Sequence, residues 1–150
     1  MQLLTGLAQL LKQESGVRVH GEQRGSAVGD FDGDGREDFV VTESGGATKL
    51  FHNEAAKPGL RVRLQGPAGN PVGLGATMWL SSGGKNGAAR ELHGGSGHWS
   101  QDSAVAVLAK PGADSEIHVR WPGGKMTVGA VPSGALEIRV DAGGKVEKVR

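Results

Sequence analysis

The chain has 150 residues, which is enough for one domain or for a domain with an appended unit. Its 17 basic and 16 acidic residues give a net charge of +1 without a basic stripe, so nucleic acid is not an expected partner. Cysteine is absent, which excludes disulfides and thiolate-bound metals. No apolar run approaches the roughly 20 residues of a membrane span.

Glycine is unusually common in this sequence and aromatic residues are rare. Glycine accounts for 27 residues, whereas aromatic residues make up 4% of the chain. The glycines follow no G-X-Y period, which excludes a collagen-like chain. They separate short apolar runs, and this pattern indicates many tight turns and an all-β fold.

The first expected element is a short amphipathic helix within residues 1–15. Leucines recur at helical spacing over residues 2–13, and we expect this apolar face to pack on the rest of the protein. A partner-binding helix is the alternative. The stretch has no basic region and no small-residue cleavage site, so it does not have the pattern of a signal peptide.

Residues 16–57 are expected to form a β-meander. Apolar and polar residues alternate over 17–20, and short strands are predicted over 26–30, 39–42 and 48–52. Lys57-Pro58-Gly59 breaks the pattern and marks a domain boundary.

Residues 58–150 are expected to form a second β domain, a sandwich or a small barrel. About eight short strands separated by glycine turns fit this length. In the strand over 60–64, Arg61 and Arg63 alternate with apolar residues, so we expect them, with Arg120, on a solvated sheet face. Trp121 is expected to cover the edge of the core.

Residues 30–38 carry aspartates in the pattern of a calcium-binding loop. Ca²⁺ takes about 6–8 oxygen ligands, and such a loop supplies them from alternate positions, with a glycine at the sixth. The glycine is Gly35, where the chain must turn sharply. The predicted ligands are the carboxylates of Asp30, Asp32, Asp34 and Asp38 and the backbone carbonyl of Arg36.

The loop differs from an EF-hand at its carboxyl end. An EF-hand ends with a bidentate glutamate at position 12, but that position is Val41, and residues 39–41 favour a strand. Mg²⁺ is less suited than Ca²⁺ because it demands tighter octahedral geometry. A turn without metal is the alternative, although closely packed carboxylates would repel one another by roughly a kilocalorie per mole or more per pair. If the calcium loop places the protein at the cell surface or outside the cell, the export signal is not present in this chain.

Residues 20–54 resemble the FG-GAP/VCBS repeat, the calcium-bearing unit of integrin-like β-propellers. The resemblance lies in the run Ser26–Val41 and its D-x-D-x-D-G-x-x-D core. It implies that the loop joins two strands of one propeller blade and holds a structural Ca²⁺.

The remainder, from Gly59 to about Val140, resembles the ASPIC/UnbV domain, which follows such repeats in secreted proteins like the cartilage acidic protein family. This resemblance implies a β architecture but carries no catalytic residues with it. It rests on four segments, Leu60–Leu64, Gly73–Ala76, Gly95–Gln101 and Val119–Lys125.

The chain departs from the propeller family in having a single repeat. A lone meander has unpaired edges, which favour pairing with another chain. Upstream blades, docking on the second domain, or exchange of strands between subunits would each complete the sheet.

The segment 93–102 is the densest polar stretch of the second domain. Zinc ligation by His93 and His98 matches no standard spacing. Ser96 does not sit in a G-x-S-x-G elbow, because His98 occupies the last position. We expect a glycine-rich loop anchored to the core by Trp99. Ligand recognition is the alternative, with residues His93, His98, Trp99, Gln101 and Asp102 as the candidate site.

We therefore expect an extracellular calcium-binding β module that acts in adhesion, recognition or assembly without catalysis. Its expected partners are a second copy of itself, upstream blades, a glycan or an extracellular protein. Self-assembly into a filament or ring and glycan binding through residues 93–102 are the two alternative functions.

Overall fold

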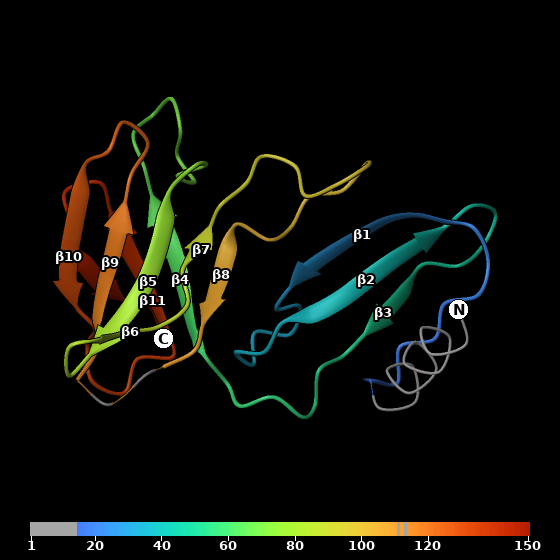
Figure 1. Ribbon diagram of the computed structural model, residues 1–150, viewed down its shortest axis with the longest axis horizontal. Helices are drawn as coiled ribbons and strands as arrows, with labels where there is room; N and C mark the ends of the chain where they lie inside the picture. The colour runs from blue at the N-terminus through green and yellow to red at the C-terminus, as the bar shows by residue number, and fades with distance from the viewer. Residues whose placement is uncertain (1–14, 111, 113) are drawn as a thin grey trace, which may run out of the picture.

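The computed structural model describes residues 15–110, 112 and 114–150, and these residues form an all-β protein (Figure 1). The helix expected over residues 2–13 lies outside the described part. Within that part, no helix is long and apolar enough to cross a membrane.

A three-stranded antiparallel sheet forms one lobe of the molecule, on the right of Figure 1. Its strands, in spatial order, are β1 (Gln23–Gly29), β2 (Asp38–Glu43) and β3 (Lys49–Phe51). The meander predicted from the sequence is therefore present. Residues 17–20, which alternate in sequence, do not form a strand.

Two further sheets form a sandwich in the other lobe. One sheet has the order β10-β9-β5-β6, with β7 also paired to β5, and the other has the order β12-β11-β4-β8. The strands are β4 (Leu60–Gln65), β5 (Thr77–Ser82), β6 (Lys85–Asn86), β7 (Arg90–Glu91), β8 (Val105–Leu108), β9 (Glu116–Arg120), β10 (Met126–Ala130), β11 (Glu137–Asp141) and β12 (Val146–Lys148).

The hydrophobic core fills the space between these two sheets. Alternate residues of each central strand point inward, as the period of two in a β-strand requires. Each fully buried Leu, Ile or Val contributes about 1.5–3 kcal/mol relative to an exposed one. Members of the core include Leu60, Val62, Met78, Leu80, Ile117, Val119, Ile138 and Val140.

Trp121 follows β9 and belongs to this core. Its side chain is buried, and its indole Nε1 donates a hydrogen bond to Thr127 Oγ1 at 2.9 Å. The bond satisfies the one polar group that burial takes from water. Trp121, which was expected to cover the edge of the core, is thus part of the core itself.

The two lobes are joined through residues 52–59. Gly59 packs so closely against β8 that a Cβ atom there would lie 2.6 Å from the carbonyl oxygen of Leu108. Its backbone N–H donates to the carbonyl of Gly35 at 2.8 Å. Only glycine fits this crossing, which brings the loop 30–38 against the sandwich.

The outer edge of β1 is covered by a loop of the sandwich, residues 96–103. Ser26 N–H donates to Ser100 Oγ at 3.0 Å, and Val28 N–H donates to Asp102 Oδ1 at 2.9 Å. In return, Ser103 N–H donates to the Val28 carbonyl at 2.9 Å. The meander thus docks on the sandwich of its own chain at this edge.

Candidate metal centre at the joint between the two lobes

The aspartate loop lies where the three-stranded sheet meets the sandwich. In the β1–β2 register Gly29 pairs with Asp38, so the loop leaves one strand and enters the next at the same level. Gly33 and Gly35 have φ angles of +78° and +86°, a left-handed conformation that favours glycine. These two glycines let the chain turn sharply, so that the aspartate side chains of the loop lie close together.

Asp30 organises the interior of the loop. Its Oδ1 accepts hydrogen bonds from Gly33 N–H at 2.8 Å and Asp34 N–H at 3.0 Å, and its Oδ2 accepts from Gly35 N–H at 2.7 Å. A carboxylate at the start of the loop therefore fixes the conformation of the turn that comes after it.

Asp38 closes the other end of the loop and is buried. Its Oδ2 accepts from Phe31 N–H at 2.9 Å, and its Oδ1 accepts from Asn53 N–H at 2.9 Å. The bond from Asn53 ties the loop to the segment after β3. A further bond strengthens this connection, since the Asn53 side-chain amide donates to the Glu37 carbonyl at 3.2 Å.

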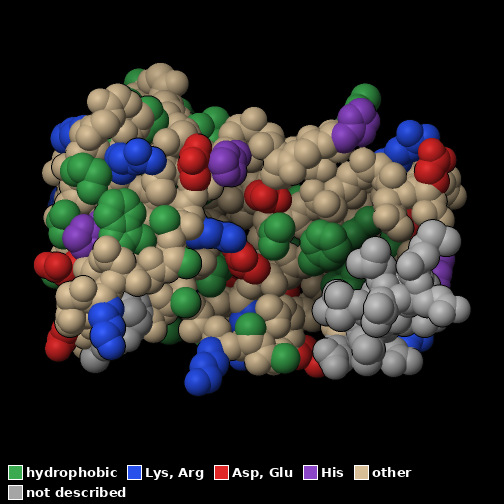
Figure 2. Space-filling model, viewed as in Figure 1, with side chains coloured by type: hydrophobic (Ala, Val, Ile, Leu, Met, Phe, Trp, Pro, Cys, Tyr) green, Lys and Arg blue, Asp and Glu red, His purple; other side chains and the backbone are tan. Residues whose placement is uncertain are grey.

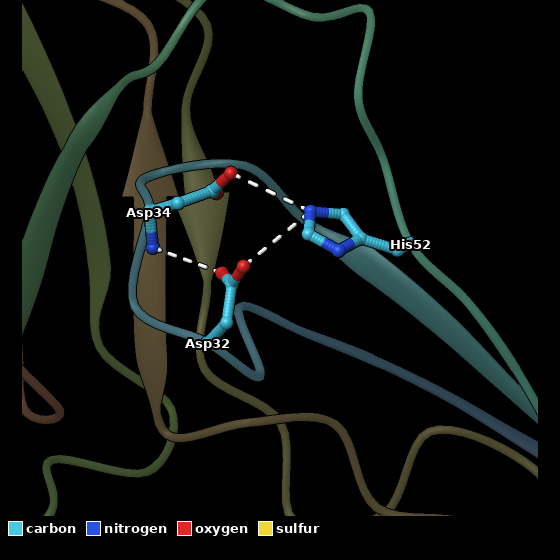
Figure 3. A group of neighbouring side chains, drawn as sticks. All are labelled: Asp32, Asp34 and His52. Atoms are coloured by element: carbon cyan, nitrogen blue, oxygen red, sulfur yellow. Dashed lines mark hydrogen bonds and ion pairs between the residues drawn. The ribbon is translucent and has the colours of Figure 1, made fainter.

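The four predicted carboxylates come together in two overlapping groups. Asp30, Asp32 and Asp38 place one ligand atom each within 4.8 Å of one another. Asp32 and Asp34 form a second such group with His52, as Figure 3 shows. His52 was not among the predicted ligands, since it lies outside the loop and comes after a different strand.

The donors of this loop fit a hard divalent cation. Carboxylate oxygens are the ligands that Ca²⁺ prefers, and several of them converge on one point of the loop. Asp30, Asp32, Asp34 and Asp38 are the side chains that would hold the ion. The carbonyl of Arg36, the fifth predicted ligand, stays a prediction; the Arg36 N–H donates to Asp34 Oδ1 at 2.8 Å.

Guanidinium groups also reach the aspartates. Arg36 pairs with Asp34, and Arg61 of β4 pairs with Asp30 Oδ2. The Arg61 side chain is only 9% exposed, so the expectation that it lies on a solvated sheet face is wrong. The physical reason is the docking of the aspartate loop, which covers this position and supplies a counter-charge.

Arg61 is the centre of a buried charge network. Its Nε lies 2.8 Å from Glu137 Oε2 on β11, and Glu137 Oε1 pairs in turn with Arg63. The parallel pairing of β4 and β11 places residues 61 and 137 side by side. Arg63 is less covered than Arg61, with a side chain that is 46% exposed.

These contacts shift the titration of the buried groups. Burial by itself would raise the pKa of Asp30, but its hydrogen bonds and the charge of Arg61 outweigh this and lower it. Burial likewise opposes ionisation of Glu137, whose pKa is nevertheless lowered by Arg63 and Arg61. The pKa of Arg61 is raised despite its burial, because both carboxylates favour its charged form.

Two more arginines connect the loop region to the sandwich. The guanidinium of Arg150 donates to the carbonyl of Gly33, and Arg90 of β7 pairs with Glu37. Together with Arg61 these groups place positive charge around an acidic loop. The loop is thus a joint between the lobes as well as a candidate cation site.

The residues of the second predicted site have different environments. Gln101 uses its amide within the chain: Oε1 accepts from Gly95 N–H at 2.7 Å, and Nε2 donates to the His93 carbonyl at 3.0 Å. Asp102 holds the edge of β1 through its bond to the Val28 amide. The side chains of Gln101 and Asp102 therefore stabilise the loop that carries His98 and Trp99.

His98 and Trp99 stand at the tip of this loop. Their rings lie 5.9 Å apart, and Trp99 is 90% exposed, so it does not anchor the loop to the core as expected. Figure 2 shows histidine and hydrophobic side chains that stand out from the surface where the loop ends. Trp99 has a φ of +55°, which is rare for a bulky residue.

A cavity of about 470 Å³ lies between the lobes, below this loop. Figure 2 shows acidic, basic and histidine side chains around the hollow. His93, Gln101 and Asp102 line it together with the Glu37–Arg90 pair. His98 and Trp99 do not belong to its lining. Three of the five predicted residues therefore line the cavity, and the other two stand at the tip of the loop.

The fold and the loop define an all-β protein in which a β-meander with an aspartate loop docks on a β-sandwich. The family profile described as ASPIC and UnbV matches residues 66–145, which is more than half of the chain, and the profile described as FG-GAP repeat matches residues 24–54. The chain therefore belongs to the ASPIC and UnbV family and carries one FG-GAP repeat ahead of that domain. A comparison with curated proteins finds no match.

Proposed function

We propose that this chain is an extracellular calcium-binding β module in which Ca²⁺ holds the shape of the loop 30–38. It acts in adhesion, recognition or assembly, and it does so without catalysis. The FG-GAP match supports the calcium assignment, since such repeats generally bind calcium and are typically extracellular.

One observation carries the proposal, namely that the aspartates of the loop gather at the joint between the lobes, with ligand atoms of Asp30, Asp32 and Asp38 within 4.8 Å of one another. Carboxylates at this spacing repel one another, and a divalent cation converts that repulsion into attraction. The carboxylates of Asp30, Asp34 and Asp38 also accept backbone N–H groups of the loop, and these bonds orient them. By fixing Asp30, the ion would also fix the partner of Arg61 in the sandwich.

Calorimetric titration of the metal-stripped protein with CaCl₂ tests this function. We expect one binding event that is lost in Asp32→Ala, because this side chain belongs to both groups of donors. Glu54→Ala is the matched control, since it removes an exposed carboxylate outside the loop. If the unmodified chain gives no heat of binding, the calcium assignment is refuted.

A recognition role has its own support in the tip of the loop 96–103. A strained backbone at an exposed aromatic residue is a reason to suspect function, and Trp99 combines both features. Its ring offers an apolar face for a sugar or a protein surface. A glycan array probed with the unmodified chain, Trp99→Ala and Trp99→Phe tests this. Binding retained only by the aromatic variants would support it, and equal signals from all three would refute it.

Self-assembly by strand pairing is the remaining candidate. One edge of the three-stranded sheet, at β1, is already covered by the protein's own loop 96–103. Pairing between subunits would therefore use β3 or an edge of the sandwich. Light scattering at high protein concentration with calcium present tests it, and a monomer under those conditions would rule it out.

A further inference from the structure

We propose that Asp32, Asp34 and His52 form a second cation subsite, of a kind suited to a transition metal such as Zn²⁺, on the outer side of the aspartate loop. The subsite shares Asp32 and Asp34 with the calcium donors, so the proposal deepens the proposed cation-binding function and rests on it. It adds a nitrogen ligand to a set of donors that otherwise consists of oxygens.

The separation of the donor atoms is the first argument. His52 Nε2 lies 3.4 Å from Asp32 Oδ2 and 3.6 Å from Asp34 Oδ2. Bonds of about 2.0–2.2 Å at tetrahedral angles place neighbouring donor atoms about 3.3–3.6 Å apart. Figure 3 shows the imidazole aimed between the two carboxylates, so the three atoms face a common point. A direct hydrogen bond would instead bring nitrogen and oxygen to about 2.7–3.2 Å.

The position of His52 is built into the fold, and this is the second argument. Phe51 pairs with Phe39 in the β2–β3 register, and their rings stack at 6.3 Å. On the other side of His52, Asn53 is hydrogen-bonded to Asp38 and to the Glu37 carbonyl. The backbone of His52 is therefore fixed on both sides and holds the imidazole over the loop.

The two carboxylates are also held by neighbouring groups. Asp32 Oδ1 accepts from Asp34 N–H at 3.1 Å, which leaves Oδ2 turned toward His52. Asp34 is oriented by Arg36, whose guanidinium would have to yield Oδ2 to an incoming ion. Such supporting contacts orient metal ligands and reduce the cost of binding.

The choice of ion depends on the ligand types. Imidazole suits Zn²⁺ and other transition metals, whereas Ca²⁺ prefers oxygen donors at about 2.3–2.6 Å. Two carboxylates and one imidazole satisfy three positions of a tetrahedral ion, and water would take the fourth. His52 and Asp32 are both accessible to solvent, with side chains that are 46% and 41% exposed, so an ion can reach the subsite.

Titration of the metal-stripped full chain with ZnCl₂, and separately with CoCl₂ followed by visible absorption, tests this subsite. We expect His52→Gln to lower the Zn²⁺ affinity by at least about ten-fold, the lower end of what loss of a supporting contact costs. The same variant should change the Ca²⁺ affinity less than about two-fold, because the oxygen donors remain. His20→Gln, an exposed histidine outside the loop, is the matched control and should bind both ions like the unmodified chain.

A second substitution guards against a variant that simply misfolds. His52→Asp supplies an oxygen in place of the nitrogen, so the ratio of Zn²⁺ to Ca²⁺ affinity should fall while the fold, followed by circular dichroism, is kept. Equal Zn²⁺ affinity in His52→Gln and His20→Gln would overturn the subsite while leaving the calcium proposal intact. Zn²⁺ binding that depends on His52 in a chain that fails to bind Ca²⁺ would support the subsite and refute the calcium proposal.

Discussion

Arg61 lies on β4 of the sandwich and Asp30 lies in the aspartate loop, 31 residues away in the sequence, yet they form an ion pair whose side chains are 9% and 1% exposed. Arg61 also bonds Glu137, so one guanidinium pairs with two buried carboxylates. The aspartate loop is therefore bound electrostatically to the sandwich, and the stability of the two lobes should be coupled through Arg61.

Arg61→Met should destabilise the protein strongly. Removal of one partner from a buried ion pair leaves an uncompensated charge and costs about 3–5 kcal/mol. Arg63→Met on the same strand is the matched control, and we expect it to cost less than about 1 kcal/mol because the Arg63 side chain is half exposed. Urea denaturation of both variants in EDTA measures the difference. Equal losses of unfolding free energy would show that the burial of Arg61 has no energetic consequence.

Glu137 should make the stability depend on pH in the acid range. Its pKa is lowered in the folded state from the ordinary 4.5, so its contribution is fully present above pH 4.5 and is lost as the pH falls through the folded pKa. The difference in unfolding free energy between the unmodified chain and Glu137→Gln should therefore shrink below about pH 4.5.

Glu54→Gln is the control for this measurement, because that carboxylate is exposed. Its curve of stability against pH should run parallel to that of the unmodified chain when both are followed by thermal melting in EDTA. A Glu137→Gln difference that stays constant or grows toward pH 3 would contradict the assigned direction of the pKa shift.

Calcium should raise the melting temperature of the chain. A ligand at about 100 times its dissociation constant stabilises the folded state by about 2.7 kcal/mol, which corresponds to roughly 5–10 °C for a chain of this size. Chelation by EDTA should reverse the shift, and Asp32→Ala should show none. An unchanged melting curve of the unmodified chain in excess EDTA would argue against a structural ion in the loop.

Gly29→Ala should loosen the docking of the loop 96–103 on β1. A Cβ atom at this position would lie 2.9 Å from Ser103 Cβ, so the loop must shift, and overpacking of this kind costs about 1–3 kcal/mol. Hydrogen exchange should accelerate at the Val28 amide, which bonds Asp102. Gly69→Ala is the control, because a Cβ atom there meets nothing within 4 Å. Unchanged protection of Val28 in Gly29→Ala would show that the contact is not tight.

The sequence by itself determined the features that depend on local pattern. The alternation of apolar residues in strands such as Leu60–Gln65 predicted which side chains form the core, because successive residues of a strand face opposite sides. The spacing of aspartates and glycines in residues 30–38 predicted a cation loop, since ligands and turn residues lie within one short segment. Both family profiles match where the sequence resembled them.

The tertiary structure alone decided which distant residues meet at that loop. Nothing near His52 in the sequence indicates a ligand; the β2–β3 register carries it to Asp32 and Asp34. Likewise, the alternation around Arg61 predicted a solvated side chain, because that pattern records only which face of a strand is polar. Arg61 is buried here since the aspartate loop docks on its part of that face, and such long-range docking leaves no periodic signal in the sequence of either partner.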